Sequence, residues 1–445
     1  MTDAPGEGEN QKHDPLAALR QPRFVLYTFS RIFSTIGNAA LQAILLWHVY
    51  ELTDSPVSLG ILGLVRFVPS LGLSMVGGVF ADTYNRRTII TIAQTIPFAA
   101  GVILSAATLN DWITVELIYA VVLGIGLANA FENPARQALL PAIVRPETFA
   151  NAVTVSSTLQ SLGMVTGSLI GGVLAYEAIG ASYVVYTCLL AGAMVTMAML
   201  SYEHDTSGPK RTVSIAAIKE GISFVRGNQV ILGAMTLDMF AVIFGGAKGL
   251  LPVYAKDILH AGGLGYGLLL ASLEIGASLM ALTLVIRPPI YRTGRALIYS
   301  VAVFGILTVI FGLSRNLYLS ILVYMAIGAA DEVSVVMRNV IIQLATPDAL
   351  RGRVSSVNQV FIQASNQLGA MESGFLAAVT SATFAVVSGG VAAVGVAGVV
   401  GWRMKELLNY VTPAHAMHGH GAPPAPSVEA KALVEAEEEH VAASG

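Results

Sequence analysis

Long apolar segments alternate with short polar breaks along most of the 445-residue chain. Stretches without a charged residue include 88–110, 148–176, 178–202 and 296–314. Each is close to or longer than the ~18 residues that indicate a membrane-spanning helix. The strict alternation of apolar and polar residues that a membrane β-barrel needs is absent. The pattern therefore predicts an all-α membrane protein.

Charged or turn-rich breaks divide the chain into twelve candidate transmembrane helices. These lie near residues 24–50, 56–81, 88–109, 113–133, 149–175, 181–202, 229–255, 264–286, 295–313, 317–338, 354–379 and 382–403. We expect two six-helix bundles with a linker between them and a tail at each end. The expected units are an N-terminal tail 1–23, a first bundle 24–203, a linker 204–228, a second bundle 229–404 and a disordered tail 405–445.

Composition agrees with this interpretation and excludes several classes of function. Hydrophobic residues make up 54% of the chain and charged residues 12%, whereas soluble domains carry roughly 25% charged residues. The net charge of -3 and the lack of a basic patch argue against nucleic-acid binding. Cys188, the single cysteine, excludes an intramolecular disulfide, and no metal-ligand spacing occurs. We expect no cofactor and no metal.

The basic residues predict the orientation in the membrane. If both termini lie in the cytoplasm, only Lys256 and Arg315 fall outside, and Arg31, Arg66 and Lys248 lie within spans, which leaves 20 of the 25 on the cytoplasmic side. The polar start of the chain lacks the pattern of a cleaved signal, so we expect the first span to remain. The predicted location is the bacterial cytoplasmic membrane, with many spans and both termini inside.

A small polar motif separates the second span from the third, in the stretch GVFADTYNRR. Gly78 allows close helix approach, Asp82 accepts hydrogen bonds, and Arg86 and Arg87 hold the turn on the cytoplasmic side. The motif resembles the loop between the second and third helices of major facilitator superfamily transporters. Asn85 stands where that family usually has Gly, and Asn tolerates a left-handed turn. The resemblance implies a cytoplasmic gate built on this motif.

The chain also repeats itself after about two hundred residues. RQALLPAIVRPETFANAV begins at Arg136, and its counterpart RNVIIQLATPDALRGRV begins at Arg338. Both place an Arg at a helix end before an apolar run, a Pro and an acidic residue. Two six-helix halves with this spacing resemble the internal symmetry of the major facilitator fold, where substrate sites lie near the midplane between the halves.

Three further stretches resemble one exporter branch of that superfamily, the branch with enterobactin secretion proteins and macrolide efflux pumps. They are SRIFSTIGNA, FENPARQALLPAIV and LLPVYAKDILHAGGLGYGLLLA. Many relatives carry Asp where this chain has Asn38. If that Asp carries protons in them, another residue must do so here.

Charged residues inside the predicted spans are the candidate functional groups, because a mid-bilayer charge costs about 3 kcal/mol or more. The repeat relates Arg66 to Glu274 and Arg31 to Asp238. We expect a basic half to face an acidic half, with the carboxylates titrating on the transport path and the arginines neutralising them or binding anionic substrate groups. The alternative is that these residues form structural salt bridges.

Asp331 and Glu332 are adjacent on the tenth span, so they point roughly 100° apart and at most one should face a cavity. Glu132 lies near the cytoplasmic end of the fourth span, within predicted reach of Arg86, which favours a gate contact shared with neighbouring Arg136.

Lys248 and Glu372 fall near the predicted outer face, where snorkelling to the interface explains them.

The linker contains an amphipathic pattern over residues 213–226, which predicts a helix on the inner membrane surface. The tail carries His415, His418 and His420, but a flexible tail offers no preformed metal site, so disorder is favoured.

Together these patterns predict a monomeric secondary transporter that exports a small, largely apolar molecule by alternating access. Proton antiport is the expected energy source, because buried carboxylates are present and a GxxxxGK[ST] phosphate-binding loop is not. Export rests on the family resemblance. A lipid flippase of the same fold is the first alternative, and a non-transporting membrane receptor is the second. No catalytic motif predicts an enzyme, and the sequence does not identify the substrate.

Overall fold

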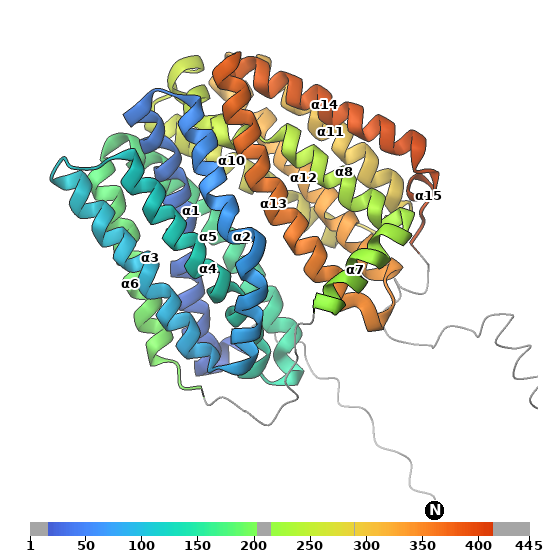
Figure 1. Ribbon diagram of the computed structural model, residues 1–445, viewed down its shortest axis with the longest axis horizontal. Coiled ribbons are helices and arrows are strands. Elements are labelled where there is room, and N and C mark those ends of the chain that lie inside the picture. Colours follow the sequence, from blue (N-terminus) through green and yellow to red (C-terminus); the bar gives the residue numbers. More distant parts are fainter. Residues whose placement is uncertain (1–16, 203–214, 289, 413–445) are drawn as a thin grey trace, which may run out of the picture.

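Two bundles of long helices lie side by side in the computed structural model (Figure 1). The structure describes residues 17–202, 215–288 and 290–412; the side chains of residues 17, 68, 70–79, 81–83, 150, 215–218 and 349 lie outside this description. No strand occurs among the described residues. The all-α prediction is thereby confirmed.

Six long helices form the first bundle. They are α1 (Pro22–Thr53), α2 (Pro56–Thr83), α3 (Arg86–Leu109), α4 (Val115–Ile143), α5 (Phe149–Glu177) and α6 (Ile179–Met199). Two short 3-10 helices flank them, η1 (Ala17–Arg20) and η2 (Pro146–Thr148).

The second bundle repeats this arrangement with one interrupted helix. Its first member is α8 (Gln229–Gly245), continued by η3 (Ala247–Leu250), α9 (Leu251–Val253) and the π-helical η4 (Tyr254–Ile258). The others are α10 (Gly262–Ile286), α11 (Thr293–Leu313), α12 (Leu317–Ala345), α13 (Arg351–Val379) and α14 (Ala382–Arg403), with the short η5 (Asp348–Leu350) before α13.

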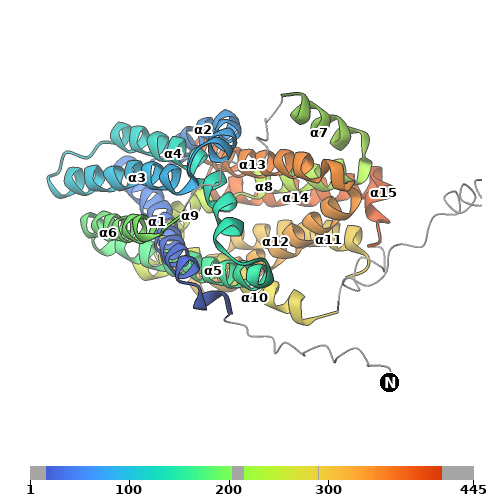
Figure 2. The same cartoon turned by 90° about the horizontal axis from the view of Figure 1, so that it is seen from below.

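Among the described residues, ten helices are long and apolar enough to cross a membrane. The other two long helices are α2 and α13. In α2 the apolar stretch with described side chains is Pro56–Phe67, and α13 is less apolar because it carries many amide and hydroxyl side chains, among them Asn358, Gln359 and Gln363. Both nevertheless lie within the bundles, where neighbouring helices cover part of their surface (Figure 2).

Side-chain caps explain where several helices begin. Asn85 accepts hydrogen bonds from the backbone N–H groups of Arg87 and Thr88 at the start of α3, at 3.0 and 3.4 Å. Its φ is -60°, so the expected left-handed turn at Asn85 is wrong. Asn is favoured here because it satisfies N–H groups that the first helical turn leaves without partners, which contributes about 1 kcal/mol.

The two ends of the molecule are named after Asp54, which follows α1, and Arg86, the first residue of α3. The Asp54 end holds the loop between α1 and α2, and the Arg86 end holds the loop between α2 and α3. At the Asp54 end three non-glycine residues take left-handed conformations, with φ between 45° and 57°: Asp54, Asp111 and His260.

Close contacts between the bundles lie toward the Asp54 end. A Cβ at Gly374 on α13 would collide with the backbone of Gly60 on α2, and a Cβ at Gly172 on α5 would collide with Gly267 on α10. Tyr266 on α10 donates a 3.0 Å hydrogen bond to the backbone carbonyl of Ala43. Figure 1 shows α2 and α13 adjacent at this end and diverging toward the Arg86 end. The bundles therefore seal the Asp54 end.

A helix lies where the linker pattern predicts one, at α7 (Ile215–Gly227). Glu220 forms a 2.5 Å ion pair with Arg353 on α13. Val225 is buried in a cluster that includes Val354 and Ile231. This helix therefore packs on the second bundle. Residues 203–214, in the first part of the predicted linker, lie outside the described residues.

The beginning of the predicted disordered tail is ordered. Residues Lys405–Leu408 form α15, where Leu407 is fully buried. Tyr410 and Thr412 continue this contact, because their backbones hydrogen-bond to Gly294 and Tyr291 next to α11. The expected boundary at 405 is therefore wrong. The three tail histidines, beyond residue 412, lie outside the described residues.

Candidate functional site: a polar cavity between the bundles

A cavity of about 250 Å³ lies between the two bundles. Its walls come from α1, α4 and α5 of the first bundle and from η3 and α10 of the second. The lining side chains are Arg31, Ser34, Thr35, Asn38, Ala39, Gln42, Asn129, Glu132, Asn133, Arg136, Gln160, Met164, Ser168, Lys248 and Glu274. Most of them are polar, and five carry ionisable groups.

Arg136 and Glu132 form the most buried ion pair of this cavity, with side chains 4% and 5% exposed. They are one helical turn apart on α4, so helix geometry brings Nε of Arg136 to 2.6 Å from Oε1 of Glu132. Gln94 on α3 donates a 3.2 Å hydrogen bond to the same oxygen. The prediction that Glu132 contacts Arg86 is wrong, since Arg136 is its ion-pair partner among the described residues.

Arg31 faces the same cavity from α1. Its Nη2 donates a 2.5 Å hydrogen bond to Oε1 of Gln160 on α5. Its Nε is buried and has no hydrogen-bond partner in the described protein. Asn38, two turns further along α1, also lines the cavity. The first bundle thus contributes two guanidinium groups to one polar wall.

Lys248 and Glu274 form the opposite wall. Nζ of Lys248 lies 3.2 Å from Oε1 of Glu274, and the two side chains are 35% and 17% exposed. Lys248 reaches this position because α8 is interrupted at Gly246 and restarts as η3. The prediction that Lys248 snorkels to the outer face is therefore wrong.

The predicted pairing of Arg66 with Glu274 is also wrong. Arg66 does not line the cavity, and no carboxylate lies within ion-pair distance of it among the described residues. Counting residues from the span ends placed Arg66 and Glu274 at similar depths in the membrane. It did not determine the directions in which their side chains point.

Asp238 likewise does not face Arg31. Its carboxylate forms an ion pair with Arg338 on α12, within the second bundle, and both side chains are under 10% exposed. This is the structural salt bridge that was the alternative for Asp238. Arg338 is the repeat counterpart of Arg136, so both halves bury an arginine at the equivalent position. Arg136 pairs with Glu132 on its own helix, whereas Arg338 pairs with Asp238 on another helix.

Asp331 and Glu332 are half-buried on α12 and do not line the cavity. Both lie close enough to Glu274 for their charges to interact. Glu274 therefore lies in an acidic surrounding with Lys248 as its direct cation.

The loop motif between α2 and α3 contacts the first bundle. Nη1 of Arg86 donates a 3.0 Å hydrogen bond to the carbonyl of Ala138 on α4, and Arg87 donates to the carbonyl of Ala198 on α6. The surroundings of Gly78 and the side chain of Asp82 lie outside the described part of the chain. The role of these residues as a gate stays a prediction.

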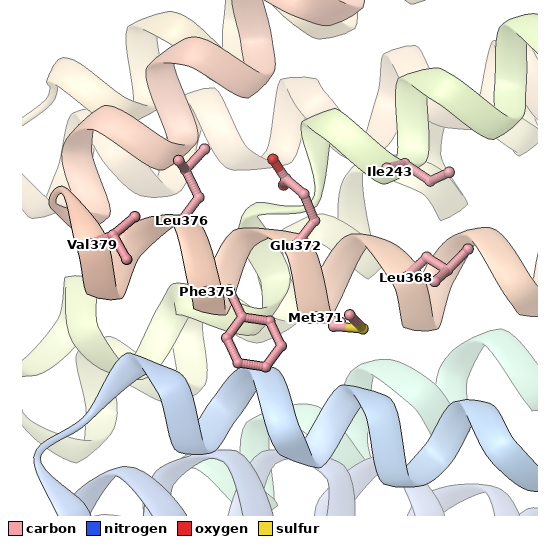
Figure 3. A pocket seen from close by; sticks show the side chains of 7 residues that line it. All are labelled: Ile243, Leu368, Met371, Glu372, Phe375, Leu376 and Val379. Carbon is pink, nitrogen blue, oxygen red and sulfur yellow. The ribbon is translucent and has the colours of Figure 1, made fainter.

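A second cavity, of about 540 Å³, is an apolar groove along α13 (Figure 3). Ile243 on α8 and a run of α13 side chains line it, and Met371 and Phe375 point toward α2. Glu372 is its charged residue, with Oε2 buried and without a hydrogen-bond partner. Glu372 thus lines an apolar groove, and the snorkelling explanation does not fit it.

Sequence reasoning missed one polar contact between the bundles at the Asp54 end. Tyr50 at the end of α1 donates a hydrogen bond to Asp257 in η4. Nζ of Lys256 lies 2.6 Å from Oδ1 of Asp54 and 5.3 Å from the centre of the Tyr50 ring. Lys256 is one of only two basic residues predicted on the outer side of the membrane. Because such residues are rare there, Lys256 could have been singled out from the sequence. We call these four residues the Tyr50 latch.

Comparison with known proteins places the chain in a family. A family model described as transmembrane secretion effector matches residues 13–430. The enterobactin exporter EntS of Citrobacter koseri is 26% identical over 339 residues, which cover 76% of this chain and 80% of EntS. The staphyloferrin A transporter of Staphylococcus aureus is 27% identical over 348 residues, which cover 74% and 84%.

Solved structures of transporters share the fold at low identity. A peptide transporter of the POT family superposes with a TM-score of 0.70 at 12% identity, over 90% of this chain and all of the transporter. The nucleoside transporter NupG gives 0.67 at 13% identity, over 87% and 99%. These similarities confirm the predicted fold of two pseudosymmetric six-helix bundles, and the family match covers nearly the whole chain: it belongs to the transmembrane secretion effectors of the major facilitator superfamily.

Proposed function

We propose that this chain exports a small, siderophore-like molecule across the bacterial cytoplasmic membrane by alternating access. The observation that carries the proposal is the polar cavity between the bundles, which has ionisable groups from both halves and lies below a sealed Asp54 end. The relatives support the direction and the substrate class, since one exports enterobactin and another transports staphyloferrin A.

The proposed orientation puts the Arg86 end in the cytoplasm. The basic residues of the short loops gather at this end, as the positive-inside rule requires. Both termini are then cytoplasmic, and the described arrangement corresponds to a carrier that accepts substrate from the cytoplasm. The proposed unit is the monomer, because the cavity is built from the two halves of one chain.

Proton antiport is the proposed energy source, with Glu274 as the coupling group. Glu274 lines the cavity, is mostly buried and has a cation, Lys248, within ion-pair distance. In this proposal the pair separates when the cavity opens to the other side, and the carboxylate of Glu274 exchanges a proton at that step. Proton exchange at Glu274 would then take place in the same cavity that binds the substrate.

A deletion strain and purified protein test this proposal. Cells that lack the protein should retain an iron-chelating metabolite that complemented cells secrete, measured by mass spectrometry of medium and cytoplasm. Proteoliposomes should then accumulate that metabolite when an outward-directed proton gradient, with an acidic lumen, is imposed. Equal secretion by deletion and complemented cells would contradict export, and accumulation that ignores the proton gradient would contradict antiport.

Lipid flipping is the second candidate function, and the apolar groove along α13 favours it. A groove of about 540 Å³ with a single carboxylate offers space for acyl chains beside α2. Transfer of a labelled lysophospholipid between leaflets, abolished by Phe375→Asp but unaffected by Glu274→Gln, would favour this function over export.

A further inference from the structure

Arg136 is buried with most of its donors unused. Its Nε binds Glu132, but Nη1 and Nη2 have no hydrogen-bond partner in the described protein, although the residue is only 3% exposed. A buried charged donor without a partner costs free energy. The side chain lines the polar cavity, so these donors lie where a substrate group would bind.

A second guanidinium with an unused donor lines the same cavity. Nε of Arg31 is buried and without a partner, while Nη2 is held by Gln160. The hydrogen bond to Gln160 fixes the arginine without neutralising it, since the amide carries no charge. Two arginines with open donors therefore share one wall.

The surroundings of the two arginines are rich in further donors. Asn129, Asn133 and Arg136 recur at helical spacing and lie on one face of α4, and all three line the cavity. Asn38 lies about two helical turns after Arg31 and therefore on the same face of α1. Side-chain amides can complete the hydrogen bonds of an oxygen-rich group.

The charges of the cavity favour an anion. Its lining has three cations, Arg31, Arg136 and Lys248, and two carboxylates, Glu132 and Glu274. Each carboxylate already has a cation within ion-pair distance. Arg31 remains as the excess positive charge.

We propose that Arg31 and Arg136 bind an oxyanion of the transported molecule, a carboxylate or a group of similar planar geometry. The assignment rests on the proposed function, in that it takes the cavity as the substrate site. A guanidinium presents parallel N–H donors that match the two oxygens of a carboxylate. The open Nη1 and Nη2 of Arg136 form such a pair, and Arg31 supplies a charge that is paired with no carboxylate among the described residues.

Citrate and triethyl citrate are suitable probes. Citrate presents carboxylates on a compact skeleton, whereas its triethyl ester has the same skeleton without charge. Binding to the purified full chain in lipid nanodiscs can be measured by calorimetry and by thermal stabilisation. We expect citrate to bind at millimolar concentration and the ester not to bind, and we expect added salt to weaken citrate binding.

Variants locate the binding. Arg31→Gln removes the excess charge, and Arg136→Lys keeps the charge beside Glu132 but removes the paired donors. Each should weaken citrate binding about 10-fold, as expected for loss of a charge-assisted hydrogen bond. Arg315→Gln removes an equal charge from an exposed site at the Asp54 end and should bind citrate like the unaltered protein.

Three results would overturn the assignment: no citrate binding to the unaltered protein, equal binding of the ester, or unaltered affinity in both Arg31→Gln and Arg136→Lys. These results are distinct from failure of the proposed function, because binding is measured without transport. If the protein binds citrate through these arginines but secretes nothing, the anion site is supported and the export proposal is contradicted.

Discussion

Lys248 and Glu274 meet on the wall of the inter-bundle cavity, with Nζ 3.2 Å from Oε1. Both belong to the second bundle, one on η3 and the other on α10. An ion pair on the wall of a cavity can separate or re-form when a carrier changes conformation. The pair is therefore the best candidate for energy coupling in this chain.

Glu274→Gln should abolish accumulation of substrate against a gradient but permit downhill exchange. Gln keeps the shape of the side chain and can still accept a hydrogen bond from Lys248, but it cannot release a proton at physiological pH. The measurement compares uphill uptake and counterflow exchange in proteoliposomes. Accumulation at the unaltered level would make Glu274 a structural residue.

Glu372→Gln is the matched control for that experiment. Glu372 is also a partly buried glutamate in the second bundle, but it lines the apolar groove rather than the polar cavity. We expect uphill export to survive in this variant. Loss of coupling in Glu372→Gln with retention in Glu274→Gln would move the coupling site to α13.

The fold was predictable because the membrane constrains it strongly. Charge-free runs between polar breaks pointed to twelve helices, the internal repeat to two halves and the loop motif to the family, and α1 to α14 follow that order. Helix boundaries were off by several residues, as at α4, which continues to Ile143 beyond the predicted end at 133. Pro134 and Pro141 lie inside this helix, whereas the span predicted from charged and turn-rich breaks ended just before Pro134.

The candidate site was only partly predictable. Arg31 and Glu274 were named from their charge and depth, and both line the cavity. Their partners were not, because depth along a helix does not determine the direction of a side chain around it. Lys248 faces inward through a break at Gly246 that apolar periodicity does not reveal.

Replacing Arg338 by Leu should lower the free energy of unfolding by about 3–5 kcal/mol, since it leaves Asp238 charged and buried without its partner. Replacing both residues, as Asp238→Leu with Arg338→Met, should restore most of the stability. Chemical denaturation in detergent measures the difference. Equal stability of Arg338→Leu and the unaltered protein would contradict a buried structural pair.

The packing of α7 on the second bundle predicts periodic accessibility. A cysteine at Ile222 should react slowly with a water-soluble maleimide and one at Ser223 rapidly, in a background where Cys188 is replaced by Ser. Val225→Asp should raise the rate at Ile222, because a buried carboxylate beside Val354 disfavours docking. Equal rates at the two positions would indicate that α7 does not pack there.

The Tyr50 latch predicts a shift between the two forms of the carrier. Tyr50→Phe removes the hydroxyl that donates to Asp257 and leaves the ring in place. A hydrogen bond to a charged group is worth about 1.5–3 kcal/mol, so the equilibrium should move roughly 10-fold or more toward opening of the Asp54 end. Spin labels on cysteines at Asn110 and Thr380, one in each bundle, should report a longer distance.

Asp54→Ala is the contrasting variant, because its ion pair with Lys256 is more exposed than the Tyr50 contact. An exposed pair contributes only about 0–1 kcal/mol, so the spin-label distance should change little. Gly172→Ala should open the same end by another route, since a Cβ there collides with the backbone of Gly267. If Gly172→Ala lengthens the distance and Tyr50→Phe does not, helix packing alone closes the Asp54 end and the latch does not control the balance.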